Sequence, residues 1–344
     1  MEQNILTTGE LLNNQGKLNQ AGYAYQLVKS YNRKAIKANP LRIKEWDYYL
    51  IANDSFGLAL TVADNSYMSL LSATFLDFNA KTEHTFSPMS FFTFGKLGLP
   101  SSSESGDIHV QKPNMEIHIC HENNRRHLLV SIPNFNKQES LKADILLTEM
   151  YDDTMVIATP YLENPKAFYY NQKIIGMKAE GTVHCNDTVH HFIPENSYGI
   201  LDWGRGVWTY ENTWYWSAAN GKIGNDLFGF NLGYGFGDTS KASENMIFYK
   251  GKAHKLDRVQ FLIPSLQNGQ PDYMKPWTFT SNDGRFESSF NPILDRSSKT
   301  KVAVLESDKH QVFGYFNGKA ILDDQAVVEF KDFLGFAEKV HNKW

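Results

Sequence analysis

Short apolar and aromatic segments separated by turn signals recur along nearly the whole chain, and this pattern limits its possible folds most. Residues 46–52 and 56–62 flank the turn Asn53-Asp54-Ser55 and therefore predict a β-hairpin. Helical periodicity is scarce, and only residues 23–29 favour a short helix. Evenly spaced short strands are typical of antiparallel barrels and sandwiches. We therefore expect an all-β protein.

The same alternation predicts strands through the rest of the chain. Hairpin turns are expected at Asn220-Gly221 and Asn317-Gly318, because Asn-Gly suits a two-residue turn. A barrel of eight to ten strands needs roughly 150–170 residues, so 344 residues accommodate two barrels. We predict one domain at residues 1–205, including a short N-terminal extension, and a second at 206–344. The remaining predicted strands are residues 108–110, 115–120, 127–132, 142–148, 167–170, 174–179, 182–185, 189–192, 214–217, 228–237, 246–249, 259–263, 277–280, 285–290, 310–316, 327–333 and 334–340.

Composition and motifs exclude several classes of function. With a net charge of −4, the bulk charge of the chain does not indicate nucleic-acid binding. No apolar run approaches the roughly 18–20 residues of a transmembrane helix, and no signal-peptide pattern is present. We therefore expect a cytoplasmic protein without an integral membrane segment. The sequence contains no phosphate-binding loop, serine-hydrolase elbow or zinc-protease motif, so no cofactor is predicted.

The cysteines and histidines match no metal-binding motif. Cys120 and Cys185 lack the spacing of a zinc site. His184, His190 and His191 gather around Cys185, which leaves two interpretations, a metal site or an exposed hairpin rich in histidine. Because no ligand motif is present, we predict the hairpin and no metal site.

Residues 201–216 form the densest aromatic block of the chain. They hold four of the seven tryptophans, with two acids, one arginine and two glycines between the rings. Indoles are large and need a partner for the ring N–H when buried, so this density predicts a cavity wall or a tight seam between domains. The predicted ligand-binding residues of the block are Trp203, Arg205, Trp208, Tyr210, Trp214 and Trp216.

Asp202 lies between two large apolar residues of this block. Burial disfavours the charged form of a carboxyl, so a protonated Asp202 is a candidate general acid toward an alkene or a carbonyl, without a cofactor. The alternative is a structural ion pair with Arg205 or His254. Arg205 also has two interpretations: it binds a ligand carboxylate, or it has an internal partner such as Asp202, Glu211 or Glu338.

Six blocks of the sequence resemble the domain of unknown function family 2804. That family is distantly similar to the tandem lipocalin-like group, which includes carotenoid hydratases, tocopherol cyclases, some fungal cyclases and lipid-handling survival factors. The resemblance covers nearly the whole chain and implies two lipocalin-like antiparallel β-barrels in tandem. The blocks are residues 42–49, 198–208, 212–216, 244–245, 251–256 and 310–314.

The resemblance also implies roles for single residues. His254 and His310 lie in matching blocks, so they are candidate proton shuttles beside Asp202, with buried structural histidines as the alternative. Tyr170 belongs to the shared segment 168–170 and is implied as a ligand-binding residue. In hydratases a charged or histidine residue and a further tryptophan follow the acid, whereas Trp203-Gly204-Arg205 follows it here. The resemblance therefore implies the fold more strongly than hydratase chemistry.

These observations predict binding of an apolar or amphipathic small molecule in a barrel or an inter-barrel pocket. If the protein is an enzyme, the expected reaction is acid-assisted hydration, isomerisation or cyclisation. A non-catalytic carrier for a lipid-like molecule is the first alternative. A glycan-binding module is the second, because aromatic platforms also stack on sugars. Ligand identity and oligomeric state stay open at this stage.

Overall fold

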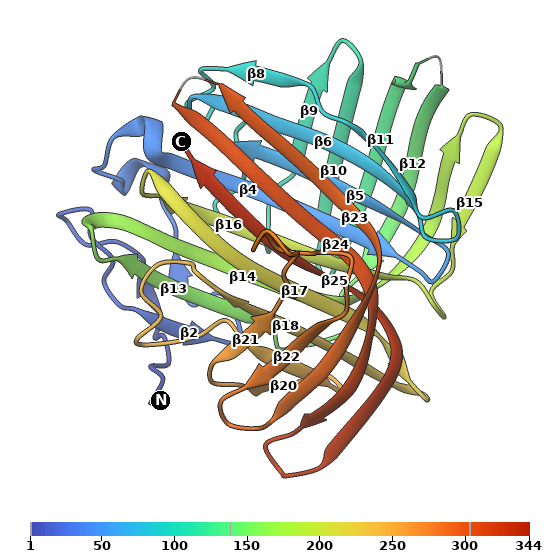
Figure 1. The fold of residues 1–344 in the computed structure, drawn as a ribbon. Helices are drawn as coiled ribbons and strands as arrows, with labels where there is room; N and C mark the ends of the chain where they lie inside the picture. The colour runs from blue at the N-terminus through green and yellow to red at the C-terminus, as the bar shows by residue number, and fades with distance from the viewer. Residues whose placement is uncertain (1, 138, 303) are drawn as a thin grey trace.

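The computed structural model describes residues 2–137, 139–302 and 304–344. Two large, curled antiparallel sheets account for most of the chain, and the second sheet crosses one side of the first (Figure 1). A separate parallel pair consists of β1 (Gly9–Glu10) and β3 (Lys29–Ser30). The predicted all-β fold is confirmed.

The first sheet has the strand order β7-β6-β5-β4-β16-β14-β12-β11-β10-β9, with β2, β8, β13 and β15 attached beside this path. The sheet curls so far that its end strand β7 approaches β11, and His84 Nε2 of β7 lies 2.8 Å from the carbonyl oxygen of Phe135 in β11. The strands are β2 (Gly22–Ala24), β4 (Ile43–Ala52), β5 (Phe56–Asp64), β6 (Met68–Asp77), β7 (Thr82–Phe86), β8 (Met89–Phe91), β9 (Ile108–Lys112), β10 (Met115–Glu122), β11 (Arg125–Asn136), β12 (Glu139–Thr148), β13 (Met155–Tyr161), β14 (Asn164–Cys185), β15 (Thr188–Phe192) and β16 (Tyr198–Val207).

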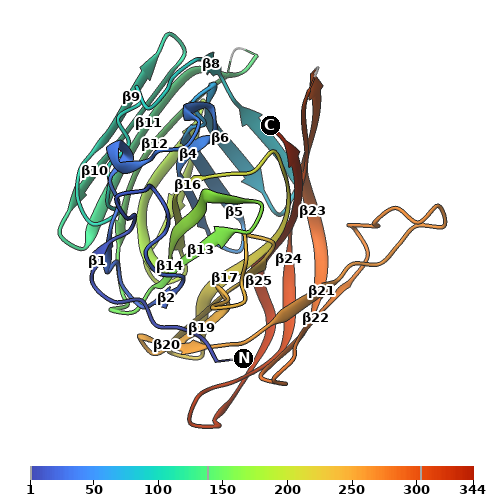
Figure 2. The same ribbon diagram turned by 90° about the vertical axis from the view of Figure 1, so that its left-hand side faces the viewer.

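The second sheet has the order β20-β19-β18-β17-β25-β24-β23-β22-β21. Its interior is rich in phenylalanine, and Phe230, Phe286 and Phe316 are fully buried there. Figure 2 shows the long hairpin β23–β24 on the side of the molecule opposite β9 and β10. The strands are β17 (Glu211–Ile223), β18 (Asp226–Tyr234), β19 (Met246–Tyr249), β20 (Lys252–Lys255), β21 (Val259–Leu262), β22 (Trp277–Ser281), β23 (Phe286–Val302), β24 (Leu305–Ile321) and β25 (Val327–Lys343).

Both predicted Asn-Gly turns are wrong. Asn220-Gly221 lies inside β17 and Asn317-Gly318 lies inside β24. These glycines serve close packing instead of a turn. A Cβ on Gly221 would lie 3.1 Å from the Phe333 ring, and one on Gly318 would lie 2.1 Å from the Glu287 carbonyl oxygen. The β17–β18 hairpin turns at Gly224, which has a φ of +62°.

The short helix predicted at residues 23–29 is also wrong. Tyr23 pairs with Ile157 at the edge of β13, so residues 22–24 form the strand β2. Tertiary pairing here outweighs a weak local preference. The described residues contain only two one-turn 3₁₀ helices, η1 (Arg33–Ala35) and η2 (Pro40–Arg42), and neither could span a membrane.

Several predicted short strands join into longer ones. Residues 167–170, 174–179 and 182–185 belong to the single strand β14. Gly176 has a φ of +79° at the register shift beside β16, so β14 bends there without ending. In the same way, residues 327–340 lie in one strand, β25. A single long, bent strand of this kind contributes residues to two differently oriented parts of the curled sheet.

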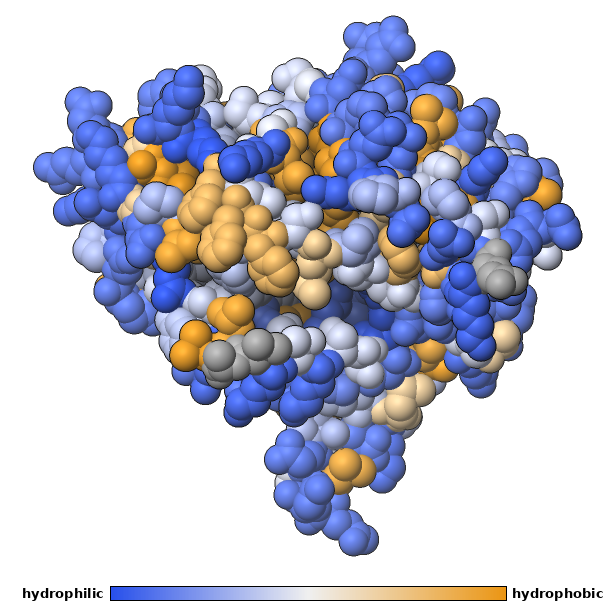
Figure 3. Space-filling view, turned by 90° about the horizontal axis from the view of Figure 1, so that it is seen from above, coloured by the Kyte–Doolittle hydropathy of each residue, from blue (hydrophilic) through white to orange (hydrophobic). Residues whose placement is uncertain are grey.

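An apolar patch lies on the upper face of the molecule over β8 (Figure 3). Met89, Phe91, Phe92 and Phe94 are exposed there. Asp64 holds the segment that carries them, since its carboxylate accepts hydrogen bonds from the Thr93 hydroxyl at 2.8 Å and the Gly95 amide at 2.9 Å. The rings are therefore presented by an anchored loop.

Candidate functional site

The seam between the two sheets is the place where both contribute side chains to one surface. Successive residues of β16 point to opposite sides, so Trp203 and Arg205 face the interior of the first barrel while Ile200 and Asp202 face the second sheet. The register aligns Ile200 with Leu50 of β4. On the second sheet, Trp216 is aligned with Glu338 and Ala218 with Phe336. The seam is therefore layered, with polar residues in one layer and apolar residues in the next.

An ion pair between Lys173 and Asp202 forms the first part of the polar layer. Lys173 Nζ lies 2.7 Å from Asp202 Oδ1, and Asn171 Nδ2 donates to the same oxygen at 2.6 Å. The side chain of Lys173 is 1% exposed and its ammonium lies 3.9 Å from the centre of the Trp216 ring. Lys173 and Asp202 belong to the first sheet and Trp216 to the second, so this group ties the two barrels together.

Glu338 of β25 forms the second part of the polar layer. Its carboxylate accepts hydrogen bonds from Trp214 Nε1 at 3.0 Å and from Gln311 Nε2 at 3.2 Å. Gln311 Oε1 in turn accepts from Arg296 at 3.0 Å and from the Tyr48 hydroxyl at 3.3 Å. Burial raises the pKa of Glu338, and nearby Lys309 opposes that shift.

Glu244 is a third buried acid between the barrels. Its Oε2 accepts from the Tyr169 hydroxyl at 3.4 Å, while Oε1 has no hydrogen-bond partner among the described residues. Gly233 makes room for the carboxyl, because a Cβ there would lie 1.7 Å from Oε1. Burial raises the pKa of Glu244 to about 7, although the charge of Lys173 opposes this.

This pKa predicts that Glu244 makes the folded protein less stable as pH rises. The folded protein holds the proton up to about pH 7, whereas the unfolded chain releases it near the ordinary value of 4.5. The stabilisation is complete below pH 4.5 and is lost as pH rises through 7, with a total of about 3 kcal/mol. We therefore expect the free energy of unfolding of the wild type, measured with urea, to fall by about 3 kcal/mol relative to that of Glu244→Gln between pH 4.5 and pH 8.5. Parallel curves for the two proteins would contradict the prediction.

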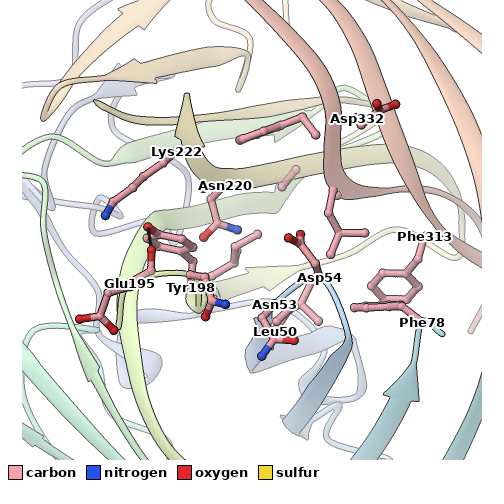
Figure 4. Close-up of a pocket in the computed structure, with 18 of the residues that line it drawn as sticks. Leu50, Asn53, Asp54, Phe78, Glu195, Tyr198, Asn220, Lys222, Phe313 and Asp332 are labelled. Carbon is pink, nitrogen blue, oxygen red and sulfur yellow. Dashed lines mark hydrogen bonds between the residues drawn. The ribbon is translucent and has the colours of Figure 1, made fainter. Parts of the chain in front are cut away.

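A cavity of about 260 Å³ lies in the apolar layer of the seam. Figure 4 shows Phe78 and Phe313 together on one side and Asn220, Tyr198 and Lys222 on the other. Asn220 Oδ1 is buried without a hydrogen-bond partner in the described chain. The lining consists of Leu50, Ala52, Asn53, Asp54, Phe78, Glu195, Asn196, Tyr198, Ile200, Ala218, Asn220, Gly221, Lys222, Phe313, Lys331, Asp332, Phe333, Leu334 and Gly335.

Three predicted site residues lie inside the first barrel instead of on the seam. The Trp203 and Tyr170 rings pack edge to face with centres 5.6 Å apart, and both are fully buried. Arg205 pairs with Asp47 at 3.0 Å. The prediction of an internal partner for Arg205 is confirmed, but its partner is none of the three acids considered. Arg205 is 0% exposed and lies in the barrel interior, so its role in ligand binding stays a prediction.

The other tryptophans of the aromatic block pack against neighbouring side chains, and Trp208 and Trp214 contact each other. The ring centre of Trp208 lies 5.2 Å from that of Trp214 and 5.9 Å from that of Trp344. Trp216 donates its ring N–H to Asn231 at 2.7 Å. Tyr210 is 42% exposed and bonds to the Val304 carbonyl. The block forms the tight seam that the sequence allowed, and none of these residues belongs to the cavity lining described above.

His254 and His310 lie apart from Asp202 and have carboxylate partners of their own. His254 Nδ1 is 3.3 Å from Asp323, whereas His310 Nδ1 is 2.7 Å from Asp295 and its ring stacks on Tyr273. The structural partner of Asp202 is Lys173, not Arg205 or His254. The roles of these residues in proton transfer remain predictions.

The histidine-rich segment 184–191 forms the expected hairpin. His184 aligns with Val189 across the pair β14–β15, and His184 and His191 are exposed. His190 packs its ring against Phe56 and Phe75. The group of potential metal ligands that the described residues do bring together lies elsewhere, at Asp107, His118 and Cys120.

The cavity residues were not identified from the sequence. Leu50, Tyr198, Ala218 and Phe313 come from four strands that are far apart in the chain. The apolar residues of β4, β16, β17 and β24 indicate buried strands, but they do not show which strands meet. Asn220 is followed by glycine, which favours a turn, so the sequence does not indicate its place in the cavity.

The family model of the domain of unknown function DUF2804 matches residues 2–344, so the chain belongs to this family. Among curated proteins, none matches the chain. A crystal structure of a Nitrosomonas europaea protein, provisionally described as AttH, has 11% identity, a TM-score of 0.55, and coverage of 92% of this chain and 98% of its own. Kievitone hydratase from Nectria haematococca has 11% identity, a TM-score of 0.47, and coverage of 100% and 97%. The first likeness supports the fold alone, which is the predicted tandem of lipocalin-like barrels.

Proposed function

We propose that this DUF2804 protein binds a small amphipathic molecule in the seam cavity, with a hydrogen-bond donor of the ligand on Asn220. The observation that carries this proposal is the buried, unpaired Oδ1 of Asn220, described above, on a residue that lines a cavity with both apolar and polar walls. A buried polar atom without a partner costs about 1–3 kcal/mol. A ligand that donates to this oxygen recovers the cost, so the site favours a molecule with an N–H or O–H group.

The rest of the lining favours an amphipathic ligand of modest size. Leu50, Phe78 and Phe313 provide buried apolar walls. The mouth carries exposed charges of both signs, including Lys222 and Glu195. The volume corresponds to about nine water molecules at about 30 Å³ each. The ligand is therefore small, or it places only one end of a longer molecule in the cavity.

The observations favour binding over turnover. Asp202 already bonds to Lys173 and Asn171 and lies in the layer behind the cavity lining. A general acid must reach the reacting atom of its substrate. Acid-assisted hydration or isomerisation by Asp202 is therefore a finer proposal with less support. Glycan binding has less support still, because the tryptophans of the block are packed inward, and only Tyr210 is widely exposed.

Replacing Asn220 by leucine should stabilise the protein and weaken its ligand binding. The change removes the unpaired oxygen, so the free energy of unfolding of the ligand-free protein should rise by about 1 kcal/mol. Anilinonaphthalene sulfonate is a suitable probe, because it has apolar rings, an N–H donor and a negative charge. Its affinity, measured by fluorescence titration, should fall about tenfold, which is the loss of about 1.4 kcal/mol.

Asn231→Leu is the matched control for this test. Asn231 is buried in β18 and fully paired, since it accepts from Trp216 and donates to the Glu244 carbonyl. Its replacement should therefore destabilise the protein.

Ala52→Trp, which fills the cavity mouth, should also abolish probe binding, whereas Ala80→Trp at an exposed position outside the lining should not. Unchanged probe affinity in both Asn220→Leu and Ala52→Trp would refute the seam site. Native mass spectrometry of freshly purified protein would then test for a ligand held elsewhere.

A further inference from the structure

The outer face of the first sheet carries a second group of reactive side chains, far from the seam. Figure 2 shows β9 and β10 on the opposite side of the molecule from β23 and β24. Alternation along β10 buries Ile117 and Ile119 in the barrel core and leaves His118 and Cys120 half-buried on the outer face. The two outward side chains are therefore neighbours on one strand.

Asp107 completes this group from the adjacent strand. The register pairs Ile108 with Ile119, so Asp107 precedes β9 beside the position of Cys120. One donor atom from each of Asp107, His118 and Cys120 lies within 4.8 Å of the other two. The Asp107 carboxylate is held in place because its Oδ1 accepts from the His121 amide at 2.9 Å. A carboxylate, an imidazole and a thiol thus converge on one point.

The geometry suits a tetrahedral ion. Zinc binds sulfur at about 2.3 Å and histidine nitrogen at about 2.0–2.1 Å, so these donors lie about 3.6 Å apart around it. Cys120 Sγ and His118 Nε2 are 3.2 Å apart. The Asp107 carboxylate lies within 4.8 Å of both donors, and its side chain is exposed, so it has room to adjust toward the ion.

Two more histidines flank the group and each has a carboxylate partner. His109 tilts against His118 with ring centres 4.8 Å apart, and its Nε2 lies 2.8 Å from Glu116. His127 is aligned with Cys120, and its Nε2 lies 2.6 Å from Asp144. Because these histidines are engaged, the three remaining donors leave a fourth position open. Three protein ligands with an open position are the pattern of a reactive zinc site, in contrast to a closed structural one.

We propose that Asp107, His118 and Cys120 bind one Zn²⁺ ion on the outer face of β9 and β10. Thiolate and imidazole donors select zinc over magnesium or calcium, which prefer oxygen ligands. His118 also lines a surface groove of about 580 Å³ together with Lys142, Asp144 and His184. The ion therefore lies at the border of this groove, where its open position accepts water or a small anion. This site is independent of the seam cavity.

Cobalt is the spectroscopic probe for the test, because a cobalt–thiolate bond gives an intense charge-transfer band in the near ultraviolet. The reduced, metal-stripped full-length protein should bind one Co²⁺ with this band, and Zn²⁺ should displace it. Cys120→Ser should abolish the band, and His118→Ala should weaken Zn²⁺ binding at least tenfold in competition with a chromophoric chelator. Asp107→Asn keeps the bond to the His121 amide but removes the charge, so it should weaken binding without unfolding β9.

Cys185→Ser and His184→Ala are the matched controls. Cys185 is the second free cysteine and His184 lies across the same groove, but neither belongs to the donor group. Both variants should retain the band and the zinc affinity. The proposal is overturned if the wild-type protein gives no thiolate band, or if the band survives in Cys120→Ser. Circular dichroism of each variant confirms that a lost band reflects a lost ligand and not a lost fold.

Discussion

Replacing Arg205 by alanine is expected to lower the free energy of unfolding by about 3–5 kcal/mol, because it leaves the Asp47 carboxyl buried without its charge partner. The guanidinium joins three parts of the first barrel. It pairs with Asp47, donates to the Trp46 carbonyl at 2.8 Å and donates twice to the Pro100 carbonyl, at 2.7 and 3.2 Å. It also lies 4.4 Å from the Trp203 ring centre. Urea unfolding followed by tryptophan fluorescence measures the loss.

Arg205→Lys separates the charge of this residue from its shape. Lysine keeps a positive charge near Asp47 but cannot reproduce the planar fork that reaches the Pro100 carbonyl twice. We expect an intermediate loss for this variant. Burial already raises the pKa of Asp47, and Arg205 opposes that shift, so Asp47 should bind a proton more readily in Arg205→Ala. If Arg205→Ala were as stable as the wild type and only probe binding were lost, Arg205 would be a ligand-binding residue after all.

The alternation of apolar residues was sufficient to predict the fold class and most strands. Residues 46–52 and 56–62 form a hairpin as expected, because each strand has one face in the barrel core. Predictions from local sequence were wrong where a residue serves a contact between strands distant in the chain. Gly221 and Gly318 admit neighbouring groups at close range within strands, and the sequence alone does not distinguish this use of glycine from a turn.

The aromatic block identified the right region but the wrong kind of surface. Trp208 and Trp214 contact each other and Trp344, so these rings fill the seam without lining a cavity. Small residues make the cavity instead, since Ala218 and Gly335 line it and leave space. Large aromatic side chains are conspicuous in a sequence, whereas a cavity depends on the small residues that face them across strands distant in sequence.

The burial of Asp202 was predicted correctly, and its partner was not. Lys173 lies in the middle of β14, at the position aligned with Asp202 in β16. The sequence offered three short strands in place of β14, so no register between residues 173 and 202 could be derived. A cross-strand ion pair needs that register. The sequence suggests Arg205 as a partner because it is near Asp202 in the chain, and His254 because it lies in a matching block.

The Lys173–Asp202 pair gives the second large effect that we expect. Asp202→Asn leaves the ammonium of Lys173 buried without the carboxylate that it contacts, and Lys173→Met leaves the Asp202 carboxylate without its ammonium partner. Each single change should lower the free energy of unfolding by about 3–5 kcal/mol. The double variant contains neither charge, and Asn171 can still donate to the amide oxygen at position 202. It should therefore cost clearly less than the sum of the single changes, with an interaction energy of at least about 2 kcal/mol.

This double-mutant cycle also decides between the two interpretations of Asp202. A structural pair at the seam predicts coupled losses of stability, and the quenching of Trp216 fluorescence should change when the ammonium above its ring is removed. A general acid without a structural role predicts that Asp202→Asn unfolds at the same urea concentration as the wild type and that the single changes are additive. The geometry favours the first result, because two donors already occupy Asp202 Oδ1 between the barrels. Additive, small effects would return Asp202 to the list of candidate catalytic residues and make a substrate screen against Asp202→Asn the next experiment.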